Sequence, residues 1–431
     1  MPQLLLNAII RPIGFTRGGW RHPSATPERA LDLDYYQEIA TVAERGRLDA
    51  LFIANSPVAP NDQWTTLFSP LEPITLLSTL AATTTHLGLI ATVSSTFTDP
   101  YQVARQLSTL DHLSKGRAGV NIVVSGSAAA AANFGFDDLP DQSDRYARAD
   151  EYLHVLQRLW DSWPADALIL DKAGARQADL GKLTAIEFRG KHLAVRGPLD
   201  IPRSPQGRPL VFQAGSSPEG RQLAAAHADA VYSAARTIDD ALAFRADIHR
   251  RQDALGRTGS RVKVLPGLIP IVGSTDAEAR RLHEEISALY PIGQAVEGLG
   301  ARLGVDLVGI DADDHFPIDL LPPVQSLSGN RSFHEIVRKH AAAGATLREV
   351  LTVTDAGNAH LRFIGAPETI ADQIQEWFRA GAADGFNLNP AISPSGLTDF
   401  VDHVLPVLQD RGIRQRDYPA DTRVRPVFGS H

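Results

Sequence analysis

The chain of 431 residues contains no cysteine, which excludes disulfide bonds, thiolate catalysis and Cys-ligated zinc or iron–sulfur sites. It also lacks an apolar run of the ~18 residues that a membrane span requires. Its first residues show no basic segment followed by the apolar stretch of a secretory signal. We therefore expect a cytoplasmic protein that is not a membrane partner.

Acidic residues outnumber basic ones, with 50 Asp and Glu against 42 Lys and Arg, so nucleic acid is not an expected partner. His283, Glu284 and Glu285 share a predicted helix but lack an HExxH or comparable ligand spacing, and we expect no metal site. The segment Ser125–Ser127 lacks the Gly-x-Ser-x-Gly pattern of serine hydrolases. No GxGxxG opens a helix after a strand, which disfavours a nicotinamide site.

Apolar runs of strand length alternate with helical patterns along most of the chain, as in parallel sheets with crossover helices. Eight strand–helix units are predicted, with strands at residues 4–10, 50–54, 87–93, 117–124, 209–213, 230–233, 263–272 and 385–388. The count favours a single α/β domain, a (β/α)8 TIM barrel over residues 1–431, with an open doubly wound sheet as the alternative. Two segments interrupt the pattern: 164–208, predicted as a hairpin and loop, and 291–360, predicted as an active-site lid with a helix around 331–351.

Polar but uncharged side chains stand at the carboxyl ends of several of these strands. The carboxyl ends of barrel strands carry the active site, and hydrogen-bonding groups without charge suit a heterocycle better than hydrolytic chemistry. The alternative is that these residues only cap the next helix. The residues are Asn55, Ser56, Thr92, Ser94, Ser95, Asn121, Ser125, Gln213, Ser216 and Ser217.

The segment 213–220, Gln-Ala-Gly-Ser-Ser-Pro-Glu-Gly, gives the sharpest local prediction. Gly215 permits a tight turn, Ser217 is a natural N-cap, and Pro218 suits the first helical position. Helix N-termini bind phosphate, so Gly215, Ser216 and Ser217 are predicted to hold a phosphate group. An ordinary strand–turn–helix junction is the alternative reading.

Many short segments, in this order, make the chain resemble the nitrilotriacetate, dibenzothiophene-sulfone and pristinamycin-type monooxygenases, a branch of the bacterial-luciferase-like superfamily. The resemblance spans nearly the full length, and the ordered set is far more specific than any member. The segments include Gly19–Arg21, Leu48–Ala54, Pro100–Arg105, Gly116–Ser125, Asn133–Gly135, Arg145–Tyr146, Leu159–Trp163, Gln213–Ser217 and Phe363–Glu368.

The resemblance implies a two-component monooxygenase that uses reduced FMN and O2 to oxygenate a small organic substrate, for instance a sulfur- or nitrogen-containing compound. A separate NAD(P)H-dependent flavin reductase would supply the reduced FMN, and the protein would form a homo-oligomer, a dimer or tetramer. Carried over by position, the flavin contacts would be Asn55, Thr92, Asn121, Gln142, Tyr146, Ser216 and Ser217. Tyr146, Gln142 and Asn121 are the candidate catalytic residues, and Trp20, Arg21 and Phe97 the candidate substrate residues.

Three positions depart from the family pattern. Asn55 replaces a typically acidic residue, Gln142 replaces a histidine, and Phe188 stands where histidine is common. Asn and Gln keep hydrogen-bonding capacity but lose charge and titration, which argues against a histidine acid or base. Two alternatives stay open: a deazaflavin (F420)-dependent oxidoreductase on the same fold, and a non-catalytic flavin-binding barrel, which the change at Gln142 makes worth considering.

Overall fold

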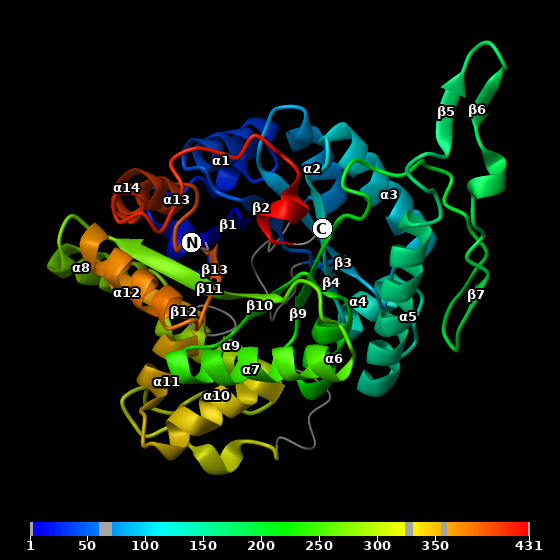
Figure 1. The fold of residues 1–431 in the computed structure, drawn as a ribbon. Helices are drawn as coiled ribbons and strands as arrows, with labels where there is room; N and C mark the ends of the chain where they lie inside the picture. Colours follow the sequence, from blue (N-terminus) through cyan, green and yellow to red (C-terminus); the bar gives the residue numbers. More distant parts are fainter. Residues whose placement is uncertain (1–2, 60–70, 324–330, 355–359, 430–431) are drawn as a thin grey trace.

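The computed structural model describes residues 3–59, 71–323, 331–354 and 360–429. Its centre is a parallel barrel whose strands β1, β2, β3, β4, β9, β10, β11 and β13 follow one another around the ring (Figure 1). The ring closes where β10 pairs with β11, Ala230 opposite Lys263, so the open-sheet alternative is wrong. The strands are Leu5–Ile10, Ala50–Ile53, Gly88–Ser94, Ala118–Val123, Leu210–Ala214, Ala230–Ser233, Lys263–Val272 and Gly385–Leu388.

Helices cover the outside of the barrel and connect successive strands (Figure 1). Their apolar faces pack on the outward-facing side chains of the strands, because a parallel sheet must bury both faces. The connecting helices are α1 (Leu33–Arg45), α2 (Pro73–Ala81), α3 (Pro100–Leu113), α5 (Gln142–Trp160), α6 (Pro218–His227), α7 (Ile238–Ala254), α8 (Asp276–Ala288) and α12 (Pro367–Arg379). After β13 the chain continues through α13 (Ser395–Asp399), a π-helical turn (Phe400–Val404) and α14 (Leu405–Asp410).

Inward-facing side chains fill the barrel. Phe52 and Phe212 meet edge to face with ring centroids 5.5 Å apart. Phe428, which follows the short helix α15 (Val424–Val427), packs on Phe212 at 5.3 Å. The C-terminal segment therefore contributes to the barrel core, where Asn7 and Asn387 also form a buried side-chain hydrogen bond of 2.9 Å.

A buried ion pair ties the C-terminal segment to the amino ends of the strands. Arg414 Nη1 lies 2.8 Å from Asp49 Oδ2, and both side chains are almost completely buried. Asp49 also accepts a hydrogen bond from the backbone N–H of Leu6 in β1. The pair thus joins β1, the residue before β2 and the C-terminal segment at one point.

The first interruption contains two antiparallel hairpins where the sequence predicted one. Strands β5 (Leu168–Asp171) and β6 (Arg176–Ala178) form one, and β7 (Phe188–Arg189) and β8 (Ala194–Val195) form the other. Hairpin β5–β6 projects away from the barrel (Figure 1), and every residue of β5 is exposed. A strand pair this short and exposed has little core of its own to stabilise it.

The second interruption forms a helical layer with its own hydrophobic cluster. Residues 324–330 and 355–359 of this segment lie outside the described residues. It contains α9 (Ile292–Leu303), α10 (Arg331–Ala342) and α11 (Leu347–Thr354), drawn in yellow-green to yellow in Figure 1. Strand β12 (Leu361–Gly365) then pairs with the extended end of β11 as a ninth strand. Within the described residues, no helix is long and apolar enough to cross a bilayer.

Candidate functional site

The predicted ring-binding residues meet at the carboxyl ends of β2, β3 and β4. Asn55 Nδ2 lies 3.4 Å from the carbonyl oxygen of Thr92, and Asn121 Nδ2 donates to Thr92 Oγ1 at 3.3 Å. Asn121 is 4% exposed, yet its Oδ1 has no hydrogen-bond partner among the described residues. A buried acceptor left unpaired costs about 1–3 kcal/mol, so the arrangement fits a ligand that donates a hydrogen bond here.

Gln213 repeats this feature on the neighbouring strand β9. The side chain is 1% exposed, and neither its Oε1 nor its Nε2 has a partner in the described part of the chain. Gly215 packs closely against this amide: a Cβ atom on Gly215 would lie only 2.6 Å from Gln213 Nε2. A buried amide with both functions open is suited to the paired carbonyl and N–H groups of a heterocycle such as flavin.

The predicted phosphate cradle has the local geometry that the sequence indicated. Ser217 is the N-cap of α6, accepting a hydrogen bond from the N–H of Gly220 at 3.1 Å, and Pro218 is the first helical residue. Gly215 and Gly220 approach closely, since a Cβ on Gly220 would lie 3.1 Å from the Gly215 backbone. Pro218 has no N–H, and the N–H groups of Gly220 and Arg221 bond to Ser217, so Glu219 keeps the helical N–H that is available for an anion.

Helix α5 brings Tyr146 to this cradle. Ser217 Oγ donates to the Tyr146 hydroxyl at 3.2 Å, which joins two predicted contacts that are 71 positions apart. Gln142 is the first residue of α5, one turn earlier and half-buried. Its side chain forms no hydrogen bond with the described residues, whereas Tyr146 is hydrogen-bonded to Ser217.

Two arginines of α5 were not predicted from the sequence, although both hold the loops of the site. Arg145 Nη1 donates to the carbonyl oxygen of Ser125, after β4, at 2.8 Å. Arg148 donates to the carbonyl oxygens of Ser95 and Thr98, after β3, at 3.0 and 3.2 Å. The Arg145-Tyr146 motif was visible, but the carbonyl partners come from distant segments and leave no spacing signal.

The three predicted substrate residues lie in two places. Trp20 and Arg21 belong to a short 3-10 turn after β1, where Trp20 is partly exposed and Arg21 donates to the carbonyl oxygen of Leu289. Phe97 follows β3 and stacks on Phe134 with ring centroids 5.1 Å apart. Phe134 also borders a cavity of about 810 Å³ whose lining includes Asn55 and Thr92.

Basic side chains gather near the carboxyl end of β1 and the start of β12, which pairs with β11. Burial, reinforced by Arg17, lowers the pKa values of Arg11, after β1, and of Arg302, on α9, to about 9. Burial and the neighbouring Arg11, Arg302 and Arg362 lower the pKa of His360 to about 4. Because cations contribute to each shift, this side of the mouth favours negatively charged groups.

The comparisons with known proteins agree with this geometry. The family model described as luciferase-like monooxygenase matches residues 14–384. The chain belongs to the luciferase-like monooxygenase family. It is 40% identical to nitrilotriacetate monooxygenase component A of Aminobacter aminovorans, covering 97% of this chain and 95% of that protein.

Solved structures of relatives share the whole architecture. DmoA from Hyphomicrobium sulfonivorans is 33% identical with a TM-score of 0.86, covering 99% of this chain and 92% of that one. A riboflavin lyase (RcaE), solved with modified FMN and riboflavin, is 31% identical with a TM-score of 0.85, covering 99% of this chain and 96% of that one. The luciferase-like barrel is thus confirmed, and the protein is a flavin-dependent monooxygenase.

Proposed function

We propose that this monooxygenase uses reduced FMN and O2 to oxygenate a small organic anion, and that a separate NAD(P)H-dependent reductase supplies the reduced FMN. The observation that carries the proposal is the contact between Tyr146 and Ser217 at the start of α6, beside the open polar atoms of Asn121 and Gln213. A phosphate-binding helix start and a flavin-ring surface then lie at one end of the barrel, as a phosphorylated flavin requires.

Reduced flavin supplies the chemistry with O2 when it is bound, and the protein orients it and excludes water. In the proposed arrangement Asn55, Thr92 and Asn121 contact the flavin ring, with Gln213 supplying hydrogen bonds as well. Gly215, Ser216 and Ser217 hold the phosphate. Tyr146 is the one predicted flavin contact with a phenolic hydroxyl, so this hydroxyl is the proposed proton donor, whereas Gln142 orients the ligand without transferring a proton.

The proposed substrate is anionic because basic groups surround one side of the mouth. Arg11, Arg17 and Arg302 come from two separate segments, and His360 lies among them. Arg21 is held by the carbonyl oxygen of Leu289, so we assign it to positioning this loop, with Trp20 beside it. Phe97 would contribute an apolar wall through its stack with Phe134.

We also propose that segment 291–360 covers the site through its described helices α9, α10 and α11. Arg302 belongs to this segment. His340, on α10 of the same segment, contacts Arg236, which follows β10: the distance between Arg236 Nη1 and His340 Nε2 is 3.3 Å. The closeness of Arg302 to His360, whose pKa it lowers, and the contact between Arg236 and His340 support a position over the barrel mouth. A covered site would keep water away from the bound flavin, which oxygenation requires.

Anaerobic titration with reduced FMN, oxidised FMN and riboflavin tests the cofactor assignment. Reduced FMN should bind most tightly, and riboflavin should bind more weakly than FMN because it lacks the phosphate. Ser217→Ala should weaken the binding of FMN by about 1 kcal/mol, or roughly fivefold, but leave the affinity for riboflavin unchanged. Equal affinity of the unaltered protein for FMN and riboflavin would contradict the phosphate assignment.

Turnover separates the proposal from its alternatives. NADH and FMN alone should give no oxygenated product, and an unrelated flavin reductase should restore it when small organic anions are screened by mass spectrometry. Turnover with a reduced deazaflavin and no O2 uptake would indicate the F420-dependent alternative. Activity with NADH and FMN without a reductase would contradict the two-component proposal.

A further inference from the structure

Four polar residues form a stripe along the face of α5 that meets α6. Tyr146, Asp150, His154 and Gln157 follow one another at intervals of four, four and three positions, which places them on one side of a helix. Tyr146 contacts the first turn of α6 through Ser217, whereas the next three lie around His227, the last residue of α6. The stripe therefore spans α6 from its start, at the flavin site, to its end.

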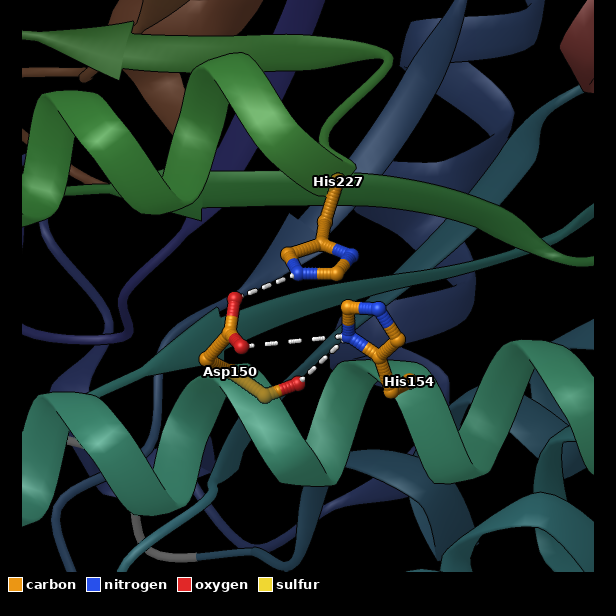
Figure 2. A group of neighbouring side chains, drawn as sticks. All are labelled: Asp150, His154 and His227. Carbon is orange, nitrogen blue, oxygen red and sulfur yellow. Dashed lines mark hydrogen bonds and ion pairs between the residues drawn. The ribbon is translucent and has the colours of Figure 1, made fainter. Parts of the chain in front are cut away.

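Two histidines and a carboxylate converge where the middle of α5 meets the end of α6 (Figure 2). Asp150 Oδ1 lies 2.8 Å from His227 Nε2, and Asp150 Oδ2 lies 3.9 Å from His154 Nδ1. One ligand atom from each residue lies within 4.8 Å of the other two. We propose that Asp150, His154 and His227 bind one divalent cation of the zinc type, linking the middle of α5 to the end of α6.

The spacing is close to what such an ion needs. Zn²⁺ bonds to imidazole nitrogen and carboxylate oxygen at about 2.0–2.2 Å, so tetrahedral ligand atoms lie roughly 3.3 Å apart. Binding requires a small opening between Asp150 and His227 and a closer approach by His154. His154 can make this movement because its side chain is 53% exposed. It would give up one hydrogen-bond contact, the 3.2 Å contact of its Nδ1 with the Asp150 carbonyl oxygen.

Gln157 supplies the outer partner that a metal-bound histidine commonly has. His227 Nδ1 lies 3.5 Å from Gln157 Oε1, and Gln157 Nε2 lies 3.5 Å from the His227 carbonyl oxygen. With Nε2 on the ion, the proton of the neutral imidazole moves to Nδ1 and faces Gln157 Oε1. An outer amide in this position fixes the tautomer and the orientation of the ring.

The environment suits a structural site that is open on one side. His227 is 3% exposed, whereas the Asp150 side chain is 53% exposed, so water can complete the coordination. Arg257 lies near enough to repel positive charge at His227, which opposes the ion and weakens its binding. The site contains neither Tyr146 nor Ser217, so the proposal is independent of the flavin assignment.

Cobalt and zinc titrations of the tag-free, chelator-treated full-length protein test the site. Co²⁺ should give the visible absorption of a four-coordinate site, saturating at one ion per chain. Zn²⁺ at about 100 times its Kd should raise the thermal midpoint by about 3 °C, since the ion binds only the folded chain.

His154→Gln and Asp150→Asn should each weaken Co²⁺ binding at least tenfold. Because His154 is exposed, its substitution should leave the fold and the metal-free thermal midpoint unchanged. His112→Gln removes another exposed helical histidine and should bind Co²⁺ as the unaltered protein does. Absence of saturable binding, or equal binding by the His154→Gln and His112→Gln variants, would overturn the proposal.

Discussion

The two ends of the barrel treat buried polar groups in opposite ways. At the amino end, Arg117 is almost fully buried and directs its guanidinium N–H groups to four carbonyl oxygens and the Thr84 hydroxyl, at 2.8–3.0 Å. Buried Asp111 accepts hydrogen bonds from Ala118 and Gln206. Arg414 is paired with Asp49. Apart from the Nε of Arg414, which has no partner among the described residues, the charged atoms of these groups are held by the protein itself.

At the carboxyl end, buried polar atoms of Asn121, Gln213 and Asn389 have no partner among the described residues. Each open atom costs free energy in the protein alone, which a bound ligand would recover. The contrast teaches that the amino end of this barrel stabilises the fold, whereas the carboxyl end is built for a ligand. Substitutions at the two ends should therefore affect different measurements.

The largest expected effect is at the amino end. Arg414→Met leaves the Asp49 carboxylate buried without its cation, which should lower the free energy of unfolding by about 3–5 kcal/mol. Chemical denaturation measures the loss, and flavin affinity of the folded protein should not change.

Arg416→Met is the matched control, because Arg416 pairs with Asp410 on the surface, with side chains 65% and 71% exposed. Its effect should stay below about 0.5 kcal/mol. Equal losses in the two variants would show that the buried pair is no more important than a surface pair.

The next effect concerns the basic side of the mouth. The pKa of folded His360 is about 4, below the ordinary value of about 6.5, so the unfolded chain binds more protons between these values. Its contribution to stability is fully present above pH 6.5 and is lost as pH falls towards 4, by up to roughly 3 kcal/mol.

His360→Gln should therefore lose less stability between pH 7 and 4.5 than the unaltered protein loses, as measured by urea denaturation across this range. His112→Gln, an exposed substitution, should follow the unaltered protein. A His360→Gln profile parallel to that of the unaltered protein would contradict the assignment.

Tyr146→Phe should affect catalysis and leave folding intact. The hydroxyl contacts Ser217 and is the proposed proton donor, so its loss should reduce kcat about a hundredfold, within the usual range for general acids. The Kd of reduced FMN should change little. If FMN affinity falls and kcat is unchanged, Tyr146 holds the phosphate and transfers no proton.

The barrel was predictable from the sequence because each strand is an apolar run followed by a helical pattern. Helix α9 was missed because it contains Gly293, Gly298 and Gly300, which disfavour helix in isolation. Packing overrides this preference, since Leu299 and Leu303 join the cluster around Phe333. Strand β12 was missed because it adds to an extension of β11 and lies outside the repeating units.

The candidate site could be proposed from the sequence where its residues lie at the carboxyl ends of strands: Thr92 and Asn121 lie within β3 and β4, and Asn55 and Ser217 follow β2 and β9. The supporting contacts of Arg145 and Arg148 were not, because their partners are backbone carbonyl groups that any sequence carries. The convergence of Asp150 and His154 with His227 escaped a search for ligand spacing, since the third residue lies 73 positions after His154 in another helix.

The smallest expected effect is at Gln142, which tests whether the uncharged character of the flavin side matters. Gln142 lies one turn before Tyr146 on α5, and a glutamine does not titrate near neutral pH. If it only orients the ligand, Gln142→Ala should raise the apparent binding constants for FMN or substrate a few-fold, with kcat nearly unchanged. The pH–rate profile should keep its shape.

Gln142→His sharpens the same test because it introduces a titrating group at this position. The variant should remain active, and its profile should gain a limb between about pH 6 and 7 as the imidazole loses its proton. Gln142→Asn keeps the amide with a shorter side chain and should add no limb. If Gln142→Ala lowers kcat as strongly as Tyr146→Phe while binding is unchanged, the amide takes part in the chemical step and the division of roles between the two residues is wrong.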